Sequence, residues 1–215
     1  MSKPSPGWEV LPVLLSLAAC SRIERSEAWT IPGPVVQLSI ESDAGVVELV
    51  AGDELRVERT SGASDATVAW TATGPGSVRI EAHCPAILPC AVNLRVTVPA
   101  DVATAVSVDT GEVWSWAITD LAVEVDEGLV DIAGVVHAVA QVGSGRIRAN
   151  LLDGADAKLV VASGDVDVTL DGGAWDLGVV AREQDVAEIP SGGAGRLDVW
   201  APAGRATVAR IDPGT

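Results

Sequence analysis

Apolar and polar residues alternate around four evenly spaced glycines in the second half of the chain. The glycines are Gly111, Gly128, Gly145 and Gly164, separated by 17, 17 and 19 residues. Apolar residues stand three and five positions before each glycine and again two and four positions after it, with Ser115 as the polar exception. Alternation with a period of two is typical of a strand that buries one face. Each unit therefore predicts a strand, a turn that glycine makes easy, and a second strand.

The near-constant spacing predicts that these units stack. One unit cannot bury its apolar face alone, whereas stacking sets each apolar side chain on the equivalent one of the next unit, about 4.8 Å away. We therefore expect an all-β fold, a single-stranded β-helix or β-solenoid with glycine turns. An antiparallel meander folded as a sandwich is the alternative, but a sandwich has no reason to keep one period. An earlier copy surrounds Gly45, and a weaker copy lies near Gly195 with Leu197 and Val199 after it.

The outward positions lead to a prediction about register. Three residues after each glycine, the chain has in turn Trp114, Asp131, Arg148 and Asp167. If the units stack in register, Arg148 lies between the two aspartates, a cross-strand pairing worth about 0.2–1 kcal/mol. A structure in which Arg148 is remote from both aspartates would contradict this register.

The composition agrees with a folded β-protein. Among 215 residues there are 22 Gly and 12 Pro, and hydrophobic residues make up 48% against 20% charged residues, which is neither a helical nor a disordered profile. The 30 Asp+Glu against 14 Lys+Arg give a formal net charge of -16. Such a chain repels phosphate backbones, so we expect no nucleic-acid partner.

The N-terminus has the features of an export signal. Residues 10–19 read VLPVLLSLAA and precede Cys20. This apolar run is too short for a membrane-spanning helix but has the length of a signal-peptide core. The sequence LAAC at 17–20 resembles the lipobox of bacterial lipoproteins, which implies a signal peptide over 1–19 and a lipid on Cys20 that anchors the protein to a membrane. The alternative is an N-terminal tail in which LAAC occurs by chance.

Residues 20–34 then correspond to the lipidated cysteine and a short polar tether, and residues 35–211 to the β-solenoid domain. Within that domain we expect N-terminal strands over 35–100 and the repeated units over 101–211. Ser21 follows the cysteine, which resembles the default signal for the outer membrane in diderm bacteria. We therefore expect a lipid-anchored envelope protein, at the outer membrane of a diderm host or otherwise on the outer face of the plasma membrane.

Two further cysteines, Cys84 and Cys90, lie in the sequence HCPAILPC. Exported proteins fold in oxidising surroundings, so a local disulfide between them is the first interpretation. A metal site formed with His83 is a weaker alternative, because a clear fourth ligand and the CxxC spacing of zinc sites are missing. Two free thiols in a cytosolic protein are the third interpretation, and it depends on the absence of an export signal. We expect no metal and no cofactor.

The order of segments resembles the bacterial "putative adhesin" domain, which is close to the head-GIN adhesin-like domains. The resemblance rests on the step Val98-Pro99-Ala100, which leads into the repeated glycine turns, and on the first strand pair SIESDAGVVELVAGDELRVER. It covers roughly residues 35–210. It implies a right-handed β-helix-like fold and a cell-envelope setting, and it implies no catalytic residue.

Motifs for catalysis or calcium binding do not stand out in the sequence. It contains neither a GxSxG turn nor an HExxH motif, the signatures of many serine hydrolases and zinc peptidases. Asp165, Asp167 and Asp171 precede a Gly-Gly pair, but the nine-residue repeat of calcium-binding β-rolls is absent. We therefore interpret them as acidic surface residues.

Trp114 and Trp116 share the outward face of the first clear repeat. Exposed aromatic pairs often contact sugars or proteins. The N-terminal strands could instead cover the two rings, because the end of a solenoid needs a cap that shields its edge. We favour the capping interpretation, with a contact surface as the alternative.

Three functions fit these features. The first, which we expect, is a noncatalytic envelope lipoprotein whose solenoid adheres to or scaffolds a protein or glycan. The second is a carbohydrate-active β-helix enzyme on envelope polysaccharide, with the candidate residues Asp131, Asp165, Asp167, Arg146 and Arg148. Carboxylates that converge in a cleft would favour the enzyme, and a flat charge ladder the scaffold. The third is an accessory sensory lipoprotein of an envelope-stress system, which the sequence does not separate from the first.

Overall fold

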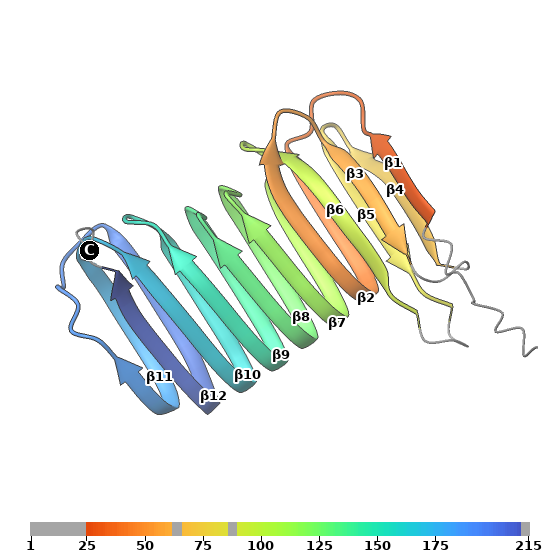
Figure 1. Ribbon diagram of the computed structural model, residues 1–215. Coiled ribbons are helices and arrows are strands. Elements are labelled where there is room, and N and C mark those ends of the chain that lie inside the picture. Colours follow the sequence, from red (N-terminus) through yellow and green to blue (C-terminus); the bar gives the residue numbers. More distant parts are fainter. Residues whose placement is uncertain (1–24, 62–65, 86–89, 212–215) are drawn as a thin grey trace, which may run out of the picture.

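The computed structural model describes residues 25–61, 66–85 and 90–211. The regular structure of these residues is all β, and their twelve strands join in one open sheet (Figure 1). The strands are β1 (Arg25–Thr30), β2 (Gln37–Gly52), β3 (Arg56–Ser61), β4 (Thr67–Gly74), β5 (Ser77–His83), β6 (Val92–Pro99), β7 (Ala103–Trp116), β8 (Asp120–Ala133), β9 (His137–Leu151), β10 (Asp156–Asp171), β11 (Trp175–Val186) and β12 (Gly195–Ile211).

The expected export signal over residues 1–19 and the expected lipid site at Cys20 lie outside the described residues. The described residues contain no helix that is long and apolar enough to cross a membrane. Part of the segment expected as a tether, residues 20–34, belongs to the sheet, because Arg25–Thr30 forms strand β1 and pairs with β3.

Strands β7 to β10, the regular centre, carry the predicted repeat. Neighbouring strands there are parallel and in register, and their pairing aligns the glycines predicted to make the turns. β2 joins them with Gly45 beside Gly111, so the earlier copy around Gly45 is confirmed. The prediction of parallel stacking is confirmed for these strands, and the antiparallel meander is wrong for them.

Each of these strands continues through its glycine and bends back there, so that its two arms face each other across the core (Figure 1). The predicted turn is therefore a bend within one strand and not a gap between two strands. The bend glycines form a column with φ between +125° and +154° at Gly45, Gly111, Gly128, Gly145 and Gly164. A Cβ atom at Gly128 would overlap the carbonyl oxygen of Gly111, so the close stacking of the bends requires glycine.

The core lies between the two arms and consists of the predicted inward positions. All of them are at most 4% exposed. In β7 to β10 they are Val106, Val108, Val113, Ser115, Val123, Val125, Val130, Ile132, Ala140, Val142, Ile147, Ala149, Leu159, Val161, Val166 and Val168. Because β-branched and aliphatic side chains stack on their equivalents in the next strand, each layer buries the apolar face of its neighbour.

The C-terminal end departs from the simple repeat. β12 lies between β10 and β11, so the last two strands are out of sequence order. The bend glycine of β12 is Gly204, whose Cβ would overlap the carbonyl oxygen of Gly164. The weaker copy predicted at Gly195 is therefore wrong. Leu197 and Val199 are buried but belong to the arm before the bend, where they pair with Ala157 and Leu159.

The N-terminal end, made of β1 and β3 to β6, uses different pairing. β5 pairs with the first half of β2 and β6 with its second half, both parallel. β4 then pairs antiparallel with β5, β3 antiparallel with β6, and β1 antiparallel with β3. β5 and β6 together thus occupy one layer, and the backbone of Val92, at the start of β6, lies against the bend glycine of β2, Gly45.

Candidate functional site

The bent strands present two outward faces. The first-arm face carries the outward residues that precede each bend, such as Ser107 of β7, and the second-arm face carries those that follow it, such as Trp114. Neighbours in register lie about 4.8 Å apart across the sheet. Each outward position therefore forms a row that runs from strand to strand over the molecule.

Trp114 and Trp116 lie together on the second-arm face. Their ring centroids are 6.0 Å apart with an interplanar angle of 87°, an edge-to-face pair. The two residues are 37% and 39% exposed. β2 covers the edge of β7, but the N-terminal strands leave more than a third of each tryptophan residue exposed to solvent. The expectation that these strands cap the two tryptophans is therefore wrong for the exposed part of each residue.

The tryptophan pair is framed by apolar and acidic neighbours. Trp116 aligns with Val50 of β2 and Ala133 of β8, and Trp114 aligns with Glu48 and Asp131 on the same two strands. The result is a flat apolar spot with carboxylates beside it. Glu48 and Val50 stand three and five residues after Gly45, and Ala133 stands five after Gly128. The glycine repeat therefore carries the signal that places these three residues beside the pair, although they were not among the expected contact residues.

A charge ladder follows the tryptophan pair on the second-arm face. Arg148 aligns with Asp131 on one side and Asp167 on the other, so the register prediction is confirmed. The ion pairs that form there are those of Arg146, whose guanidinium lies 3.5 Å from the Asp165 carboxylate and 3.7 Å from that of Asp167. All three side chains are nearly half exposed, so each pair contributes little to stability.

The ladder continues beyond β10. Arg205 of β12 donates its backbone N–H to Asp165 over 3.2 Å and its guanidinium to Glu183 of β11 over 2.8 Å. The side-chain hydrogen bond to Glu183 raises the pKa of Arg205 above its ordinary value. Asp131, Asp165 and Asp167 therefore alternate with arginines along successive strands, whereas Asp171 aligns with Ile211. In the described ranges no group of three or more His, Cys, Asp or Glu residues could hold a metal ion.

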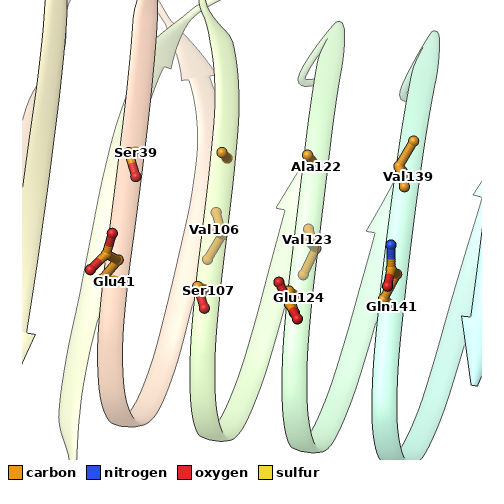
Figure 2. A pocket seen from close by; sticks show the side chains of 10 residues that line it. Ser39, Glu41, Val106, Ser107, Ala122, Val123, Glu124, Val139 and Gln141 are labelled. Carbon is orange, nitrogen blue, oxygen red and sulfur yellow. The ribbon is translucent and has the colours of Figure 1, made fainter. Parts of the chain in front are cut away.

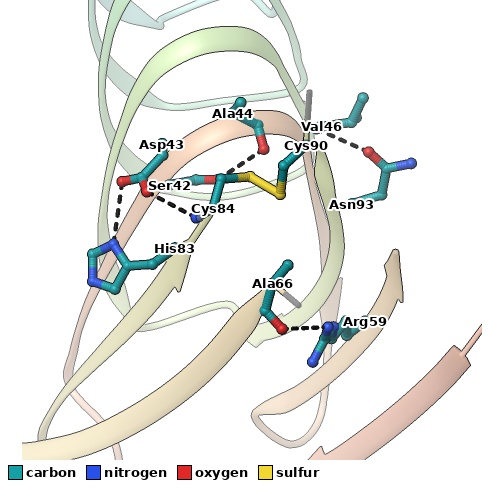
Figure 3. Close-up of a disulfide and its surroundings, with 10 residues drawn as sticks. All are labelled: Ser42, Asp43, Ala44, Val46, Arg59, Ala66, His83, Cys84, Cys90 and Asn93. Carbon is teal, nitrogen blue, oxygen red and sulfur yellow. Dashed lines mark hydrogen bonds and ion pairs between the residues drawn. A yellow bond between two sulfur atoms is a disulfide. The ribbon is translucent and has the colours of Figure 1, made fainter. Parts of the chain in front are cut away.

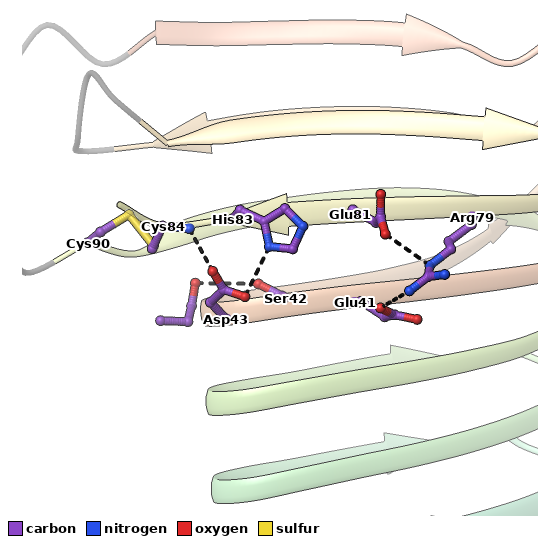
Figure 4. Close-up of polar contacts among 9 residues, drawn as sticks. Glu41, Ser42, Asp43, Arg79, Glu81, His83, Cys84 and Cys90 are labelled. Carbon is purple, nitrogen blue, oxygen red and sulfur yellow. Dashed lines mark hydrogen bonds and ion pairs between the residues drawn. A yellow bond between two sulfur atoms is a disulfide. The ribbon is translucent and has the colours of Figure 1, made fainter. Parts of the chain in front are cut away.

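The disulfide between Cys84 and Cys90 is confirmed, with Cα atoms 5.6 Å apart. It closes the turn between β5 and β6 (Figure 3). Asp43, two residues before the bend glycine of β2, ties this turn to the neighbouring layer. Its carboxylate accepts the backbone N–H of Cys84 at 2.9 Å and lies 3.1 Å from Nδ1 of His83 (Figure 4). His83 and the two cysteines thus serve as a structural tie, and the metal interpretation is wrong for this turn.

Arg79 of β5 makes a second polar tie on the first-arm face. Its guanidinium bonds to Glu41 of β2 and lies 3.2 Å from Glu81 (Figure 4). The hydrogen bond to Glu41 raises the pKa of Arg79 above its ordinary value. Arginine is cationic at any physiological pH, so this tie stays intact across that range.

A shallow hollow of about 190 Å³ lies on the first-arm face over β2, β7, β8 and β9 (Figure 2). It exists because Ser39, Ala105 and Ala122 are small and adjacent in register. Glu41 and Glu124 stand beside it with Ser107 between them. His137, which the sequence places between two repeats, is exposed in the next strand of this face.

No family model matches the sequence, and no curated protein matches it. Solved structures to which this chain is similar include a "putative cell adhesion protein" from Clostridium sporogenes, with 10% identity over 87% of this chain and 100% of that chain and a TM-score of 0.49. A "putative adhesin" from Bacteroides fragilis matches with 10% identity over 89% of this chain and 98% of that chain and a TM-score of 0.37.

Proposed function

We propose that this chain is a noncatalytic, lipid-anchored protein of the bacterial cell envelope that adheres to or scaffolds an envelope glycan or protein. Trp114 and Trp116 form the centre of the contact surface, and Cys20 carries the lipid. The stack of bent strands is a right-handed β-solenoid that presents this surface. The host membrane is the outer membrane of a diderm cell or otherwise the plasma membrane, with the domain on its outer face.

The observation that carries the proposal is the exposed tryptophan pair. A Trp residue that is more than a third exposed leaves a large apolar area in water, and such areas mark contact sites more often than solitary aliphatic residues do. The pair stands on a flat sheet with Glu48, Glu112 and Asp131 nearby. Ring faces suit the apolar side of a sugar, and carboxylates accept hydrogen bonds from its hydroxyl groups, so a glycan is the better-matched partner.

The ladder geometry supports a noncatalytic role. Arg146 pairs with Asp165 and Asp167, and Arg148 aligns between Asp131 and Asp167. A glycosidase needs two carboxyl groups that face one bond from opposite sides, whereas these carboxylates project from neighbouring strands of one sheet face and alternate with guanidinium groups. This is the flat arrangement expected for a scaffold.

The contact surface is tested with the double variant Trp114→Ala/Trp116→Ala. The matched control is Trp200→Ala, which removes an indole that is 52% exposed on the opposite, first-arm face. Wild-type protein is applied to an array of purified envelope polysaccharides and, separately, to immobilised envelope proteins. We expect the double variant to bind at least tenfold more weakly and the control to bind as wild type does.

Equal binding by the double variant, or a wild-type protein that binds neither probe, would contradict this surface. Binding to the proteins but not to the polysaccharides would keep the surface and replace the glycan as its partner. Turnover of any arrayed polysaccharide would contradict the noncatalytic role and favour the enzyme.

The anchor is tested separately by mass spectrometry of the N-terminal peptide, combined with protease treatment of intact cells. We expect a peptide that begins at an acylated Cys20. A domain that the protease removes lies outside the cell and favours adhesion, whereas a protected domain favours scaffolding or the sensory alternative. An intact, unmodified Met1 would overturn the lipoprotein assignment.

A further inference from the structure

The sheet ends with a half-filled layer at its N-terminal side. β1 extends the second-arm side of the sheet by pairing with β3. On the first-arm side, β4 pairs only with β5 among the described strands. Among the described residues, the layer of β1 therefore has a strand on one side of the core and none on the other, and one edge of β4 has no neighbouring strand (Figure 1).

This gap opens the end of the core to solvent. Trp70 aligns with buried Ile80 and therefore faces the core side, yet it is 42% exposed. Trp29 of β1 aligns with buried Val57 and is only partly buried. Between β1 and β4 lies a hollow of about 300 Å³, lined by Trp29, Val57, Val68, Ala69, Trp70 and Ile80. Its lining is apolar, and its size suits one large aromatic side chain.

β4 also lacks the usual protection of an edge strand. Natural sheets place charged residues or proline on exposed edges, because a bare edge pairs with other chains. The edge strand at the opposite end, β11, carries Asp176, Arg182, Glu183 and Asp185. β4 reads TVAWTATG and has no charged residue and no proline. In a chain with a formal net charge of -16, an uncharged edge is where another copy meets the least repulsion.

We propose that a second copy of this chain covers this end, and that the β1 strand of each copy fills the empty half-layer beside β4 of the other. In this dimer the N-terminal ends of the two copies meet, and the two-fold axis is parallel to the strands. The rotation aligns the second-arm side of one copy with the first-arm side of the other. The β1 strand of one copy therefore lies on the first-arm side of the other copy, where the gap lies. Both contacts are then identical, as a two-fold dimer requires.

The register of the strands fits this arrangement. Trp29 aligns through Val57 and Val96 with Leu49, four residues after the bend glycine of β2. Trp70 aligns through Ile80 with Ile40, five residues before that glycine. The two indoles thus stand at almost the same distance from the bend. In the dimer, Trp29 of each copy would enter the hollow that Trp70 lines in the other copy.

The charged residues of this end do not oppose the pairing. Glu27 of β1 lies 3.4 Å from the guanidinium of Arg59 in its own copy, so its charge is already balanced. The proposed axis keeps the start of β1 on the same side in both copies. If Cys20 is acylated as proposed above, both lipids can therefore enter one membrane. The dimer itself does not depend on that assignment.

The test uses the full chain, solubilised in a mild detergent, as wild type, Trp70→Lys and Trp200→Lys. Sedimentation equilibrium measures its oligomeric mass over a range of concentrations. We expect wild type and Trp200→Lys to reach twice the monomer mass. Trp70→Lys should raise the dissociation constant at least 100-fold, because it sets a charge in each hollow. Circular dichroism checks that both variants keep the fold.

Cross-linking provides a readout that does not depend on stability. Ala28 of β1 and Ala69 of β4 are both exposed, and each precedes one of the indoles that meet in the dimer. The double variant Ala28→Cys/Ala69→Cys should form a disulfide-linked dimer under mild oxidation. Neither single variant should do so, because each residue then faces no second thiol.

Three results would overturn the proposal. The first is a wild-type protein that stays monomeric at every concentration. The second is a dimer that survives Trp70→Lys, or a cross-link that forms in a single variant. The third is a monomer whose Trp70 becomes shielded only when lipid vesicles or another envelope protein are added, which would assign this end to a different partner.

Discussion

The regular centre and the N-terminal end reach the same layered architecture by different means. In the centre, one strand supplies both arms of a layer, and a column of glycines lets the bends stack closely. At the N-terminal end, two strands share a layer, and the Cys84–Cys90 disulfide closes the turn between them. The two arms of a layer are thus joined by a bend within one strand in the centre and by a covalent link at the N-terminal end.

The polar interactions of the two regions differ in the same way. The centre places its charges in outward rows such as that of Arg146. The end brings polar groups into its turns and core. Asp43 binds the disulfide turn, and buried Arg59 donates to the carbonyl of Ala66 over 2.6 Å (Figure 3). A repeat can rely on identical apolar layers, whereas an end must satisfy backbone groups that have no following layer.

The largest expected effect comes from Gly128→Ala in the centre. The added methyl group would overlap the Gly111 carbonyl oxygen at a backbone with φ of +150°, so the stack must separate locally. We expect a loss of about 3 kcal/mol or more, which lowers Tm by roughly 6–12 °C in a chain of this size. Thermal unfolding followed by circular dichroism measures it.

The matched control is Gly154→Ala, at a turn with φ of +82° and no atom within 4 Å of the added carbon. Backbone strain alone should then cost about 1–2 kcal/mol. Equal losses at the two glycines would show that the column matters for its backbone conformation and not for close stacking.

The next largest effect comes from removing the disulfide with Cys84→Ser/Cys90→Ser. The bridge spans a sequence separation of 6, and closing a loop this short is worth about 2 kcal/mol. Hydrogen exchange should accelerate in β5 and β6 and stay unchanged in β8 to β10, because local unfolding remains local in a stacked array. Uniform acceleration throughout the sheet would show that the two regions unfold as one.

A smaller effect of the opposite sign is expected for Ser115→Ala. Ser115 is fully buried at an inward position, and its hydroxyl has no hydrogen-bond partner among the described residues. Removing a buried, unpaired hydroxyl should stabilise the protein by about 1 kcal/mol, measured by urea denaturation. Exposed Ser107→Ala on the same strand should change stability by less than about 0.5 kcal/mol. A destabilised Ser115→Ala variant would mean that the hydroxyl is paired in solution.

The smallest effect is expected for Arg146→Gln in the charge ladder. The ion pairs with Asp165 and Asp167 are nearly half exposed, so the loss should be about 0.5 kcal/mol or less. The difference from wild type should vanish in 1 M salt, where the Debye length falls to about 3 Å. A loss that persists at high salt would point to packing of the arginine stem and not to charge.

Much of the centre was predictable because its signals are local and repeated. The alternation around Gly111 and its equivalents identified the inward residues, and the constant spacing predicted the parallel register that aligns Arg148 with Asp131 and Asp167. The pair Cys84 and Cys90 was predictable for the same reason, since the two residues are close in the chain. The inward faces and the disulfide follow from side chains a few residues apart, and the register follows from the repetition of one unit along the chain.

Features that depend on distant segments were not predictable in the same way. A repeat was expected at Gly195, whereas the bend lies at Gly204, because the insertion of β12 between β10 and β11 breaks the period. Residues 20–34 were expected to form a tether, although Arg25–Thr30 pairs with β3. Nor could alternation show which arginine of the ladder makes the ion pairs, because that depends on side-chain conformation across strands.

Local residue patterns were thus enough to predict the all-β class, the buried face of each repeat, the bend positions of the centre and the disulfide. They were enough because period-two alternation and glycine at a crowded backbone act within a single unit. The order of the last strands, the antiparallel layers of the N-terminal end, the exposure of Trp114 and Trp116 and the empty half-layer beside β4 follow instead from how the strands assemble. These features depend on which strand edges pair in the folded protein. The residues of one strand specify which of its faces is buried, but they do not specify which other strand pairs with its edge.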